Sequence, residues 1–209
     1  MVLYDDFTRD EALDPQEWLV NGPAARASLI GHASVVNPQI AFDRSNGLCI
    51  SGIDSNNQQA GVQTLQKFAP PFTVTAECMT TQAHAGALLL SIASATGKSG
   101  MGIIGGQGTT DQDTGFVYTS PHGADGSWDV RGRLSPIPPD ADVWYTLAIR
   151  VDAAGNATVA TSSGDHILGQ ATQYAGIGPF YVILGQNATS QQYPGPNQAC
   201  WLALQVIHG

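Results

Sequence analysis

Glu77 is the residue whose type and position most clearly suggest chemistry. It lies in residues 72–80, FTVTAECMT, where apolar residues alternate with Thr73, Thr75 and Glu77. Alternation of period two predicts a strand with one face in a core, so we expect Glu77 on the other face. A carboxyl group there could bind ligand hydroxyl groups or act as an acid. The alternative is a solvated carboxylate paired with a neighbour such as Arg150, which is ordinary on an antiparallel strand.

Hydrolysis would require a second carboxyl group near Glu77. Glycoside hydrolysis uses two carboxyl groups separated by roughly 5–10 Å. Only three glutamates are present, at positions 11, 17 and 77. Asp129 lies in a second alternating stretch, residues 128–134. If the protein is an enzyme, we expect Glu77 and Asp129 to be its catalytic residues.

Aromatic and amide side chains near the predicted loops are candidates for contact with a ligand. An aromatic ring can stack on the CH groups of a sugar ring, and an amide can pair with its hydroxyl groups. A place in the core is an open alternative for Trp128 and Tyr193, and we expect Trp18, Trp144 and Trp201 to be core residues. The ligand-binding candidates are Gln63, Tyr118, Trp128, Arg131, Gln186 and Tyr193.

The three cysteines are Cys49, Cys78 and Cys200, and each lies in an apolar, strand-like stretch. Their small, odd number predicts buried thiols that pack as small apolar side chains. A single bridge, Cys49–Cys78 or Cys78–Cys200, is the alternative. The five histidines are scattered without metal-ligand spacing, so the sequence predicts no zinc site.

The net charge of −9, with only eight Lys and Arg residues, bounds the class of partner. No basic stripe could neutralise phosphates, so nucleic acid is excluded, and polyanionic glycans are disfavoured. We therefore expect a neutral partner. No apolar run approaches the ~20 residues of a membrane span, and the N-terminus lacks the features of a signal peptide. Either the protein is cytosolic or an export signal has been removed; of the two, an extracellular or periplasmic location is favoured, and the oligomeric state is left open.

The elements that must position these residues are strands. About a dozen short apolar stretches recur at roughly 8–12-residue spacing, separated by turns rich in Gly and Pro, as in a β-sandwich or barrel. Residues 145–151 alternate as clearly as residues 72–80, and Asn46-Gly47 predicts a hairpin turn. No segment has a sustained helical period. We expect one all-β domain over residues 1–209.

Several of these pieces, in this order, resemble the concanavalin A-like lectin/glucanase superfamily. They are Tyr4-Asp5-Asp6-Phe7 with Leu13-Asp14-Pro15 and Trp18, then Asn46 to Ser51, Phe72 to Glu77, Trp144 to Ile149 with Asp152 and Gly155, and an apolar strand at the end. The resemblance implies an antiparallel two-sheet jelly-roll sandwich with adjacent first and last strands. It also implies carbohydrate binding on a concave sheet face. Members often hold a structural calcium near those strands, which makes Asp5 and Asp6 the metal candidates; no other cofactor is implied.

The superfamily includes lectins, glycoside hydrolases and polysaccharide lyases, and the fold does not choose among them. Its retaining glucanases carry a Glu-x-Asp-x-x-Glu strand, which is absent here. Our first hypothesis is a lectin-like domain that binds a neutral oligo- or polysaccharide on the concave face. The alternatives are a glycoside hydrolase or polysaccharide lyase that uses Glu77, and a structural or adhesion domain without a small ligand.

Overall fold

The protein is almost entirely β-structure. The computed structural model describes residues 2–27, 33–34, 38–51, 58–81, 87–106, 114–122, 126–187 and 198–209. Among the described residues there is one five-residue helix, and no helix is long and apolar enough to cross a membrane. The elements are β1 (Val2–Asp6), β2 (Trp18–Val20), α1 (Pro23–Ala27), β3 (Ala33–Ser34), β4 (Gln39–Asp43), β5 (Gly47–Ser51), β6 (Gln58–Thr64), β7 (Phe72–Thr80), β8 (Ala87–Ala93), β9 (Gly100–Gly106), β10 (Gly115–His122), β11 (Ser127–Ser135), β12 (Tyr145–Val151), β13 (Asn156–Ser163), β14 (His166–Tyr174), β15 (Tyr181–Asn187) and β16 (Ala199–His208).

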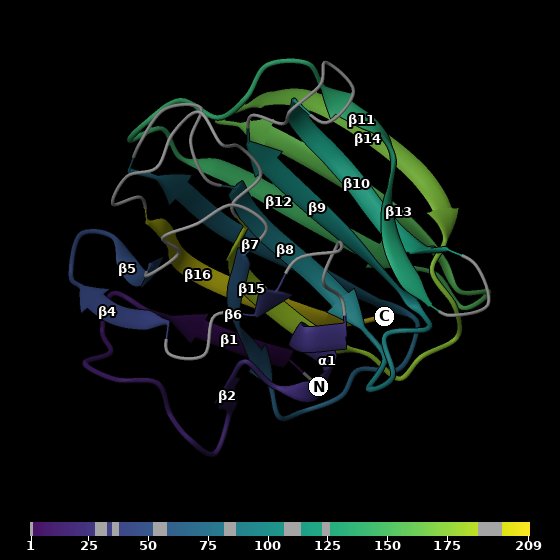
Figure 1. Ribbon diagram of the computed structural model, residues 1–209, viewed down its shortest axis with the longest axis horizontal. Helices are drawn as coiled ribbons and strands as arrows, with labels where there is room; N and C mark the ends of the chain where they lie inside the picture. Colours follow the sequence, from purple (N-terminus) through teal and green to yellow (C-terminus); the bar gives the residue numbers. More distant parts are fainter. Residues whose placement is uncertain are drawn as a thin grey trace.

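The strands form two eight-stranded sheets that pack face to face, as the prediction of an all-β sandwich requires (Figure 1). The first sheet, sheet A, has the order β14-β13-β12-β7-β16-β5-β4, and β1 also pairs with β16. The second, sheet B, has the order β11-β10-β9-β8-β15-β6-β2, and β3 also pairs with β6. The expected adjacency of the first and last strands is confirmed, because β1 and β16 pair from Val2↔Ile207 to Asp6↔Ala203.

The alternation of side chains in β7 shows which face of sheet A packs against sheet B. Phe72, Val74, Ala76 and Cys78 are buried between the sheets, whereas Glu77 faces outward and is exposed. The same alternation in β12 buries Tyr145, Leu147, Ile149 and Val151. Chain neighbours occupy opposite sheets here, since β6 and β8 belong to sheet B and β7 lies between them in the sequence but in sheet A.

A hydrogen bond links the two sheets near the N-terminus. Trp18 of β2 is buried in the core, where its ring lies 5.6 Å from that of Phe7. Its indole Nε1–H donates to Oδ2 of Asp5 in β1 at 2.7 Å. Because β1 belongs to sheet A and β2 to sheet B, this bond joins an edge of one sheet to an edge of the other. The expected core position of Trp18 is therefore confirmed.

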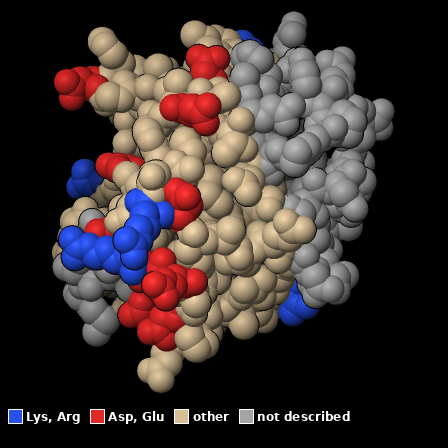
Figure 2. Space-filling view, turned by 90° about the vertical axis from the view of Figure 1, so that its left-hand side faces the viewer, with Lys and Arg blue, Asp and Glu red and all other residues tan. Residues whose placement is uncertain are grey.

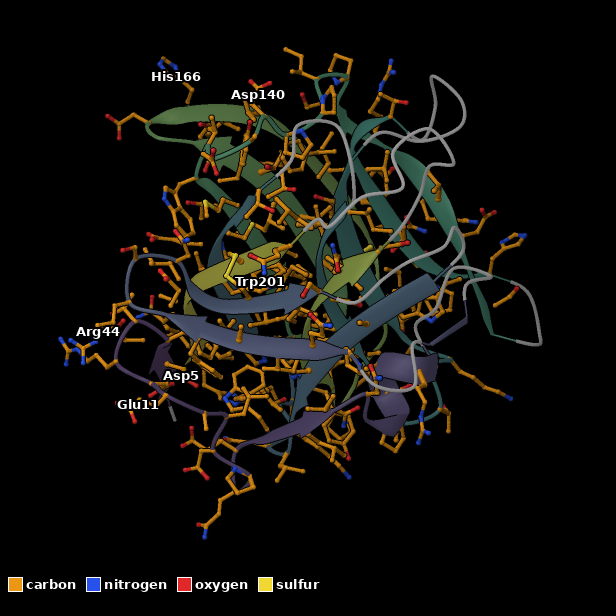
Figure 3. The ribbon with its side chains drawn as sticks, turned by 60° about the vertical axis from the view of Figure 1, so that its left-hand side comes forward. Asp5, Glu11, Arg44, Asp140, His166 and Trp201 are labelled. Atoms are coloured by element: carbon orange, nitrogen blue, oxygen red, sulfur yellow. A yellow bond between two sulfur atoms is a disulfide. The ribbon has the colours of Figure 1, made fainter. Side chains whose placement is uncertain are left out.

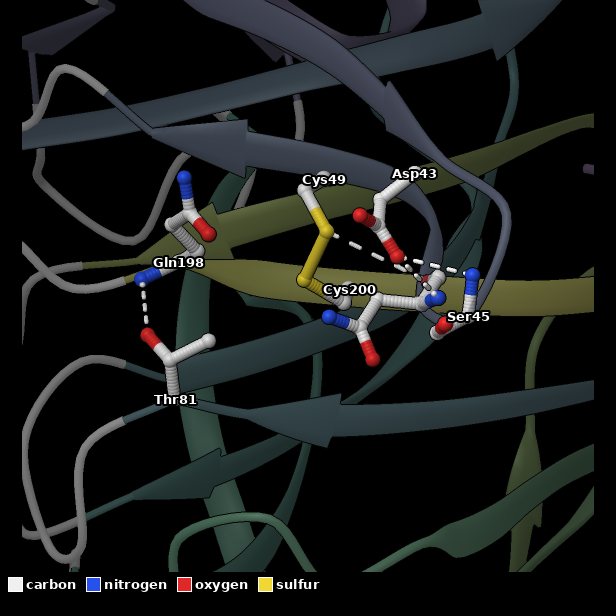
Figure 4. Close-up of a disulfide and its surroundings, with 7 residues drawn as sticks. Asp43, Ser45, Cys49, Thr81, Gln198 and Cys200 are labelled. Carbon is white, nitrogen blue, oxygen red and sulfur yellow. Dashed lines mark hydrogen bonds between the residues drawn. A yellow bond between two sulfur atoms is a disulfide. The ribbon is translucent and has the colours of Figure 1, made fainter. Parts of the chain in front are cut away.

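The prediction of three free thiols is wrong. Cys49 of β5 and Cys200 of β16 form a disulfide, and the thiol of Cys78 is free and buried (Figure 4). The alternation that buries Cys78 between the sheets turns Cys49 and Cys200, which are direct cross-strand partners, to the outer face. Neither bridge involving Cys78 could form for this reason. Half-buried Trp144, expected in the core, packs against the disulfide on that outer face. A disulfide is typical of proteins from oxidising compartments.

Candidate functional site

Glu77 lies in a hollow on the outer face of sheet A. Ala203 of β16 pairs with Glu77 of β7 on one side and with Asp6 of β1 on the other. Side chains in one such row point to the same face of a sheet, so Glu77 and Asp6 lie on the same face, on either side of Ala203. We call this the Glu77 hollow; its volume is about 380 Å³, and it is lined by Asp6, Thr8, Thr75, Glu77, Leu202, Ala203 and Gln205.

The spacing of the two carboxylates follows from the sheet. Neighbouring strands are about 4.8 Å apart, so the Cα atoms of Glu77 and Asp6, which are two strands apart, are separated by about 10 Å. Inverting glycosidases hold their two carboxyl groups roughly 6.5–9.5 Å apart to leave room for a water molecule. The Cα separation of Glu77 and Asp6 is thus of the same order as the carboxyl separation that inverting glycosidases use.

Local hydrogen bonds keep Asp6 ionised. Its Oδ1 accepts the hydroxyl of Thr8 at 2.6 Å and the backbone N–H of Thr8 at 3.2 Å, and its Oδ2 lies 3.0 Å from Nε of Arg9. The bond from the Thr8 hydroxyl is the main cause that lowers the pKa of Asp6. Asp6 thus stays negatively charged to a lower pH than an ordinary aspartate does.

The expected pairing of Glu77 with Arg150 is wrong. In the register of β7 and β12, Glu77 lies opposite Thr146, whereas Arg150 lies opposite Thr73. These positions are four residues apart along β7, or about 13 Å at 3.3 Å per residue. The ion pair found in the described part of the chain joins Arg9 to Asp6, and Glu77 takes no part in it.

Asp5 and Asp6 point to opposite faces of β1, so the structure does not bring them together as metal ligands. Asp5 lies opposite core residue Leu204 and accepts the Trp18 indole, whereas Asp6 faces the Glu77 hollow. In the ranges that the structure describes, no group of three or more His, Cys, Asp or Glu residues could hold a metal ion. The calcium expected at Asp5 and Asp6 therefore has no matching set of ligands there.

The carboxyl group of Asp5 should make stability depend on pH. Burial raises its pKa to about 6; the Trp18 hydrogen bond opposes the rise, and Asp10 and Glu17 add to it. The folded state thus binds this proton more tightly than the unfolded state, whose pKa is about 3.9. The resulting stabilisation is complete below about pH 4 and is lost as the pH rises through about 6. Urea unfolding between pH 4 and pH 8 should show this loss in the wild type but not in Asp5→Asn.

The matched control for Asp5→Asn is Asp6→Asn, because the shift has the opposite sign at the next residue. The lowered pKa of Asp6 stabilises the fold above its unfolded pKa, and this contribution is lost as the pH falls. The difference between wild type and variant should therefore grow toward high pH for Asp6→Asn. If the two variants show the same pH dependence, the opposite environments of Asp5 and Asp6 are contradicted.

Gln63 and Trp128 were expected to bind a ligand, and the structure gives both a structural role. Gln63 is 2% exposed, and its Oε1 accepts the backbone N–H groups of Ala24 and Ala25 at 2.9 and 3.1 Å, capping the start of α1. Trp128 is 4% exposed; its indole N–H donates to the carbonyl of Gly97 at 2.9 Å. Side chains this buried and bonded offer neither an accessible amide nor an open ring face.

Gln63→Met should reduce stability more than Gln59→Met. Both glutamines lie on the same face of β6 and are 2% exposed. Oε1 of Gln59, however, has no hydrogen-bond partner in the described part of the chain. Removing the Gln63 amide takes the acceptor from two buried N–H groups and should cost about 1–3 kcal/mol. Removing the Gln59 amide should change stability by less than about 0.5 kcal/mol. Urea unfolding of the two variants tests this; equal losses would contradict the capping role.

The remaining predicted ligand-binding residues are not gathered around Glu77. Tyr118 is half-buried and packs on the core from β10, and Gln186 is buried on β15 opposite Ala60, so both face the interior. Arg131 is exposed on β11 and its Nη1 lies 2.9 Å from Nδ1 of His122. Tyr193 lies outside the described residues.

Asp129, the expected partner of Glu77, lies on a different sheet. It is exposed on β11, the edge strand of sheet B, whereas β7 is inside sheet A. The carboxylate that the structure brings near Glu77 is Asp6. Thr8, Thr75 and Gln205 also line the Glu77 hollow and were missed. Thr75 and Glu77 are two residues apart on one strand, so the sequence pattern indicates that both face outward, and it could have identified Thr75. The place of Gln205 depends on β16 lying between β7 and β1, which the sequence does not show.

Comparison with solved structures gives the same architecture at low sequence identity. A β-glucanase of Bacillus licheniformis matches with a TM-score of 0.61 at 10% identity over 100% of this chain and 98% of that one. A β-1,3-glucanase of Mycobacterium marinum matches with a TM-score of 0.62 at 15% identity, covering 98% and 97%. A structure linked to the endo-acting O-glycanases with which human gut bacteria initiate mucin breakdown has a TM-score of 0.67 at 13% identity, covering 98% of both chains.

The chain has the concanavalin A-like jelly-roll fold. This confirms the resemblance seen in the sequence at the level of the fold, which the chain shares with these solved structures. No protein-family model matches the chain, and no curated protein matches it. At 10–15% identity the likeness concerns the fold alone, so the function of this jelly roll must be argued from its own residues.

Proposed function

We propose that the protein is an enzyme that cleaves or remodels a neutral polysaccharide at the Glu77 hollow. The observation that carries this proposal is the row Glu77–Ala203–Asp6, in which two carboxylate residues on the same face of sheet A line one hollow. The solved structures with this fold that are named as glucanases support a polysaccharide as the substrate class. The net charge of −9 supports a neutral substrate.

The two carboxyl groups would have different roles. Asp6, held ionised by Thr8 and Arg9, would orient and activate a water molecule for attack on the sugar carbon. Glu77 is exposed in the hollow, within reach of a sugar bound over it. Glu77 would then donate its proton to the leaving oxygen. The hydroxyl group of Thr75 and the amide of Gln205 would hold sugar hydroxyl groups.

Glycan binding without turnover is the second candidate, and a specific observation favours it. Both oxygens of Asp6 already accept hydrogen bonds or an ion pair, which makes this carboxylate a weaker base. The described strands of sheet B provide no second pair, because Asp129 is their only carboxylate. The hollow would then bind the sugar through the same polar groups and leave it intact.

One experiment separates the two candidates. The protein is incubated with β-1,3-glucan, β-1,4-glucan, chitin and mucin O-glycans, and the release of new reducing ends is measured beside binding by calorimetry. Release of reducing ends supports the enzyme. Binding without release supports the lectin-like domain. If the protein neither binds nor cleaves any of these glycans, both candidates are contradicted, and the structural or adhesion role remains.

A further inference from the structure

A second hollow adjoins the first along the same side of the molecule. Its volume is about 460 Å³, and it is lined by Thr8, Arg9, Asp10, Glu11, Phe42 and Arg44. We call it the Arg44 hollow. Thr8 also lines the Glu77 hollow, so the two hollows meet at this residue. Arg44 and Glu11 project from the same side of the protein (Figure 3).

The charges that line the Arg44 hollow cancel. Arg9 and Arg44 contribute two positive charges, and Asp10 and Glu11 contribute two negative charges. Basic and acidic side chains lie side by side on this face (Figure 2). An ionic ligand would gain little from such a lining, since each attraction is offset by a repulsion. A neutral ligand rich in hydroxyl groups can use both the guanidinium donors and the carboxylate acceptors.

The turn between β4 and β5 places Arg44 firmly at the hollow. Oδ1 of Asp43 accepts the backbone N–H groups of Ser45 and Asn46 at 2.7 and 2.9 Å, and Gly47 supplies the positive φ of 70° that starts β5 (Figure 4). Among the described residues Arg44 has no ion pair, whereas Arg9 is held by Asp6. The guanidinium group of Arg44 therefore lies on an ordered turn, and its N–H groups can donate hydrogen bonds to a ligand.

Phe42 supplies an apolar surface to the same hollow. It is half-buried on edge strand β4, packs against the core, and lines the hollow with the rest of its side chain. An aromatic surface beside charged hydrogen-bonding groups suits a sugar ring, which has apolar CH groups between its hydroxyl groups. A hollow lined only by polar groups would offer no apolar surface for the CH groups of a sugar ring.

We infer that the Arg44 hollow is a second sugar subsite, which binds the neutral hexose unit next to the one held over Glu77. This inference rests on the proposed function and adds the length and chemistry of the ligand: a chain of at least two neutral units that runs from β7 across β16 and β1 to the β4–β5 turn. Thr8 would contact the linkage between the two units.

Chain-length dependence tests this inference. Calorimetry with laminari- and cello-oligosaccharides of two to six units should give wild-type affinity that increases on the order of tenfold as the chain comes to fill both hollows. Arg44→Ala should remove most of that increase while leaving the affinity for the shortest bound chain within about twofold. Phe42→Leu, which keeps an apolar side chain in the fold, should reduce the increase as well. The matched control is Arg150→Ala, an exposed arginine of β12 outside both hollows, which should bind like the wild type.

The outcomes separate the two proposals. If Arg44→Ala and Phe42→Leu keep the full increase with chain length, or if the wild type shows none, the second subsite is contradicted and the Glu77 hollow is unaffected. If the wild type binds none of these oligosaccharides, and none of the glycans tested above, both proposals are wrong. An equal loss in Arg44→Ala and Arg150→Ala would indicate a nonspecific effect of charge and would also contradict the subsite.

Discussion

Glu77→Gln is expected to lower the rate of reducing-end release roughly 10²- to 10⁴-fold, the usual contribution of a positioned general acid. Glutamine keeps the size and hydrogen-bonding capacity of the side chain but cannot donate a carboxylic proton. Binding of the intact glycan should persist. Glu77 is exposed and has no ion pair among the described residues, so the unfolding free energy should change by less than about 0.5 kcal/mol. The measurement is turnover of whichever glycan is cleaved, beside calorimetric binding and urea unfolding.

Two further variants show whether the loss belongs to the Glu77 hollow. Asp6→Asn should also reduce turnover, because the amide cannot activate water. Asp129→Asn removes an equally exposed carboxylate on the other sheet and should leave turnover unchanged. If Asp129→Asn abolishes turnover and Glu77→Gln does not, catalysis occurs on sheet B. If all three variants remain active, none of Glu77, Asp6 and Asp129 acts as the acid.

The double variant Cys49→Ala/Cys200→Ala is expected to lose about 5 kcal/mol of unfolding free energy. The bridge joins residues 151 positions apart, and the chain-entropy estimate for a loop of this length is about 5 kcal/mol. Globular proteins are stable by only about 5–15 kcal/mol in total, so the variant should be close to unfolding at room temperature. Urea unfolding followed by tryptophan fluorescence measures the loss.

Cys78→Ala is the matched control for the double variant. Cys78 is equally buried, but it is a free thiol in the core, so its replacement should cost only about 1 kcal/mol. A reductant present during unfolding should destabilise the wild type and Cys78→Ala, and it should not affect the double variant. If the double variant unfolds within 1 kcal/mol of the wild type, the bridge does not constrain the unfolded chain as the estimate assumes.

The features that the sequence predicts well are those fixed by local pattern. The alternation in residues 72–80 determines which side chains of β7 are buried, and every one of the four expected inward residues is buried. The hairpin at Asn46-Gly47 is also present, although the positive φ occurs at Gly47 and not at Asn46. Such features depend on neighbours in the chain, so the sequence displays them directly.

The features that the sequence does not predict depend on which distant residues meet. Gln63 looked like a ligand-binding amide, yet it caps a helix about 40 residues away in the sequence. Trp128 looked like a platform for a sugar, yet it packs against Ala24, Ala25 and Ile183. The disulfide and the placement of Glu77 and Asp6 in one row likewise depend on β16 lying beside β5, β7 and β1. Strand order has no local signature, so these pairings required the structure.

The central place of β16 has a consequence for how the protein is made. β16 lies between β7 on one side and β5 and β1 on the other. It follows all the other strands of the two sheets in the sequence, so it is synthesised after them. At roughly 5–20 residues per second, the interval between completing β7 and β16 is on the order of 10 s. During that time β1, β5 and β7 present unpaired edges to other chains. Sheet A can therefore close only after synthesis of β16, and the open edges of β1, β5 and β7 are sites for wrong pairing until then.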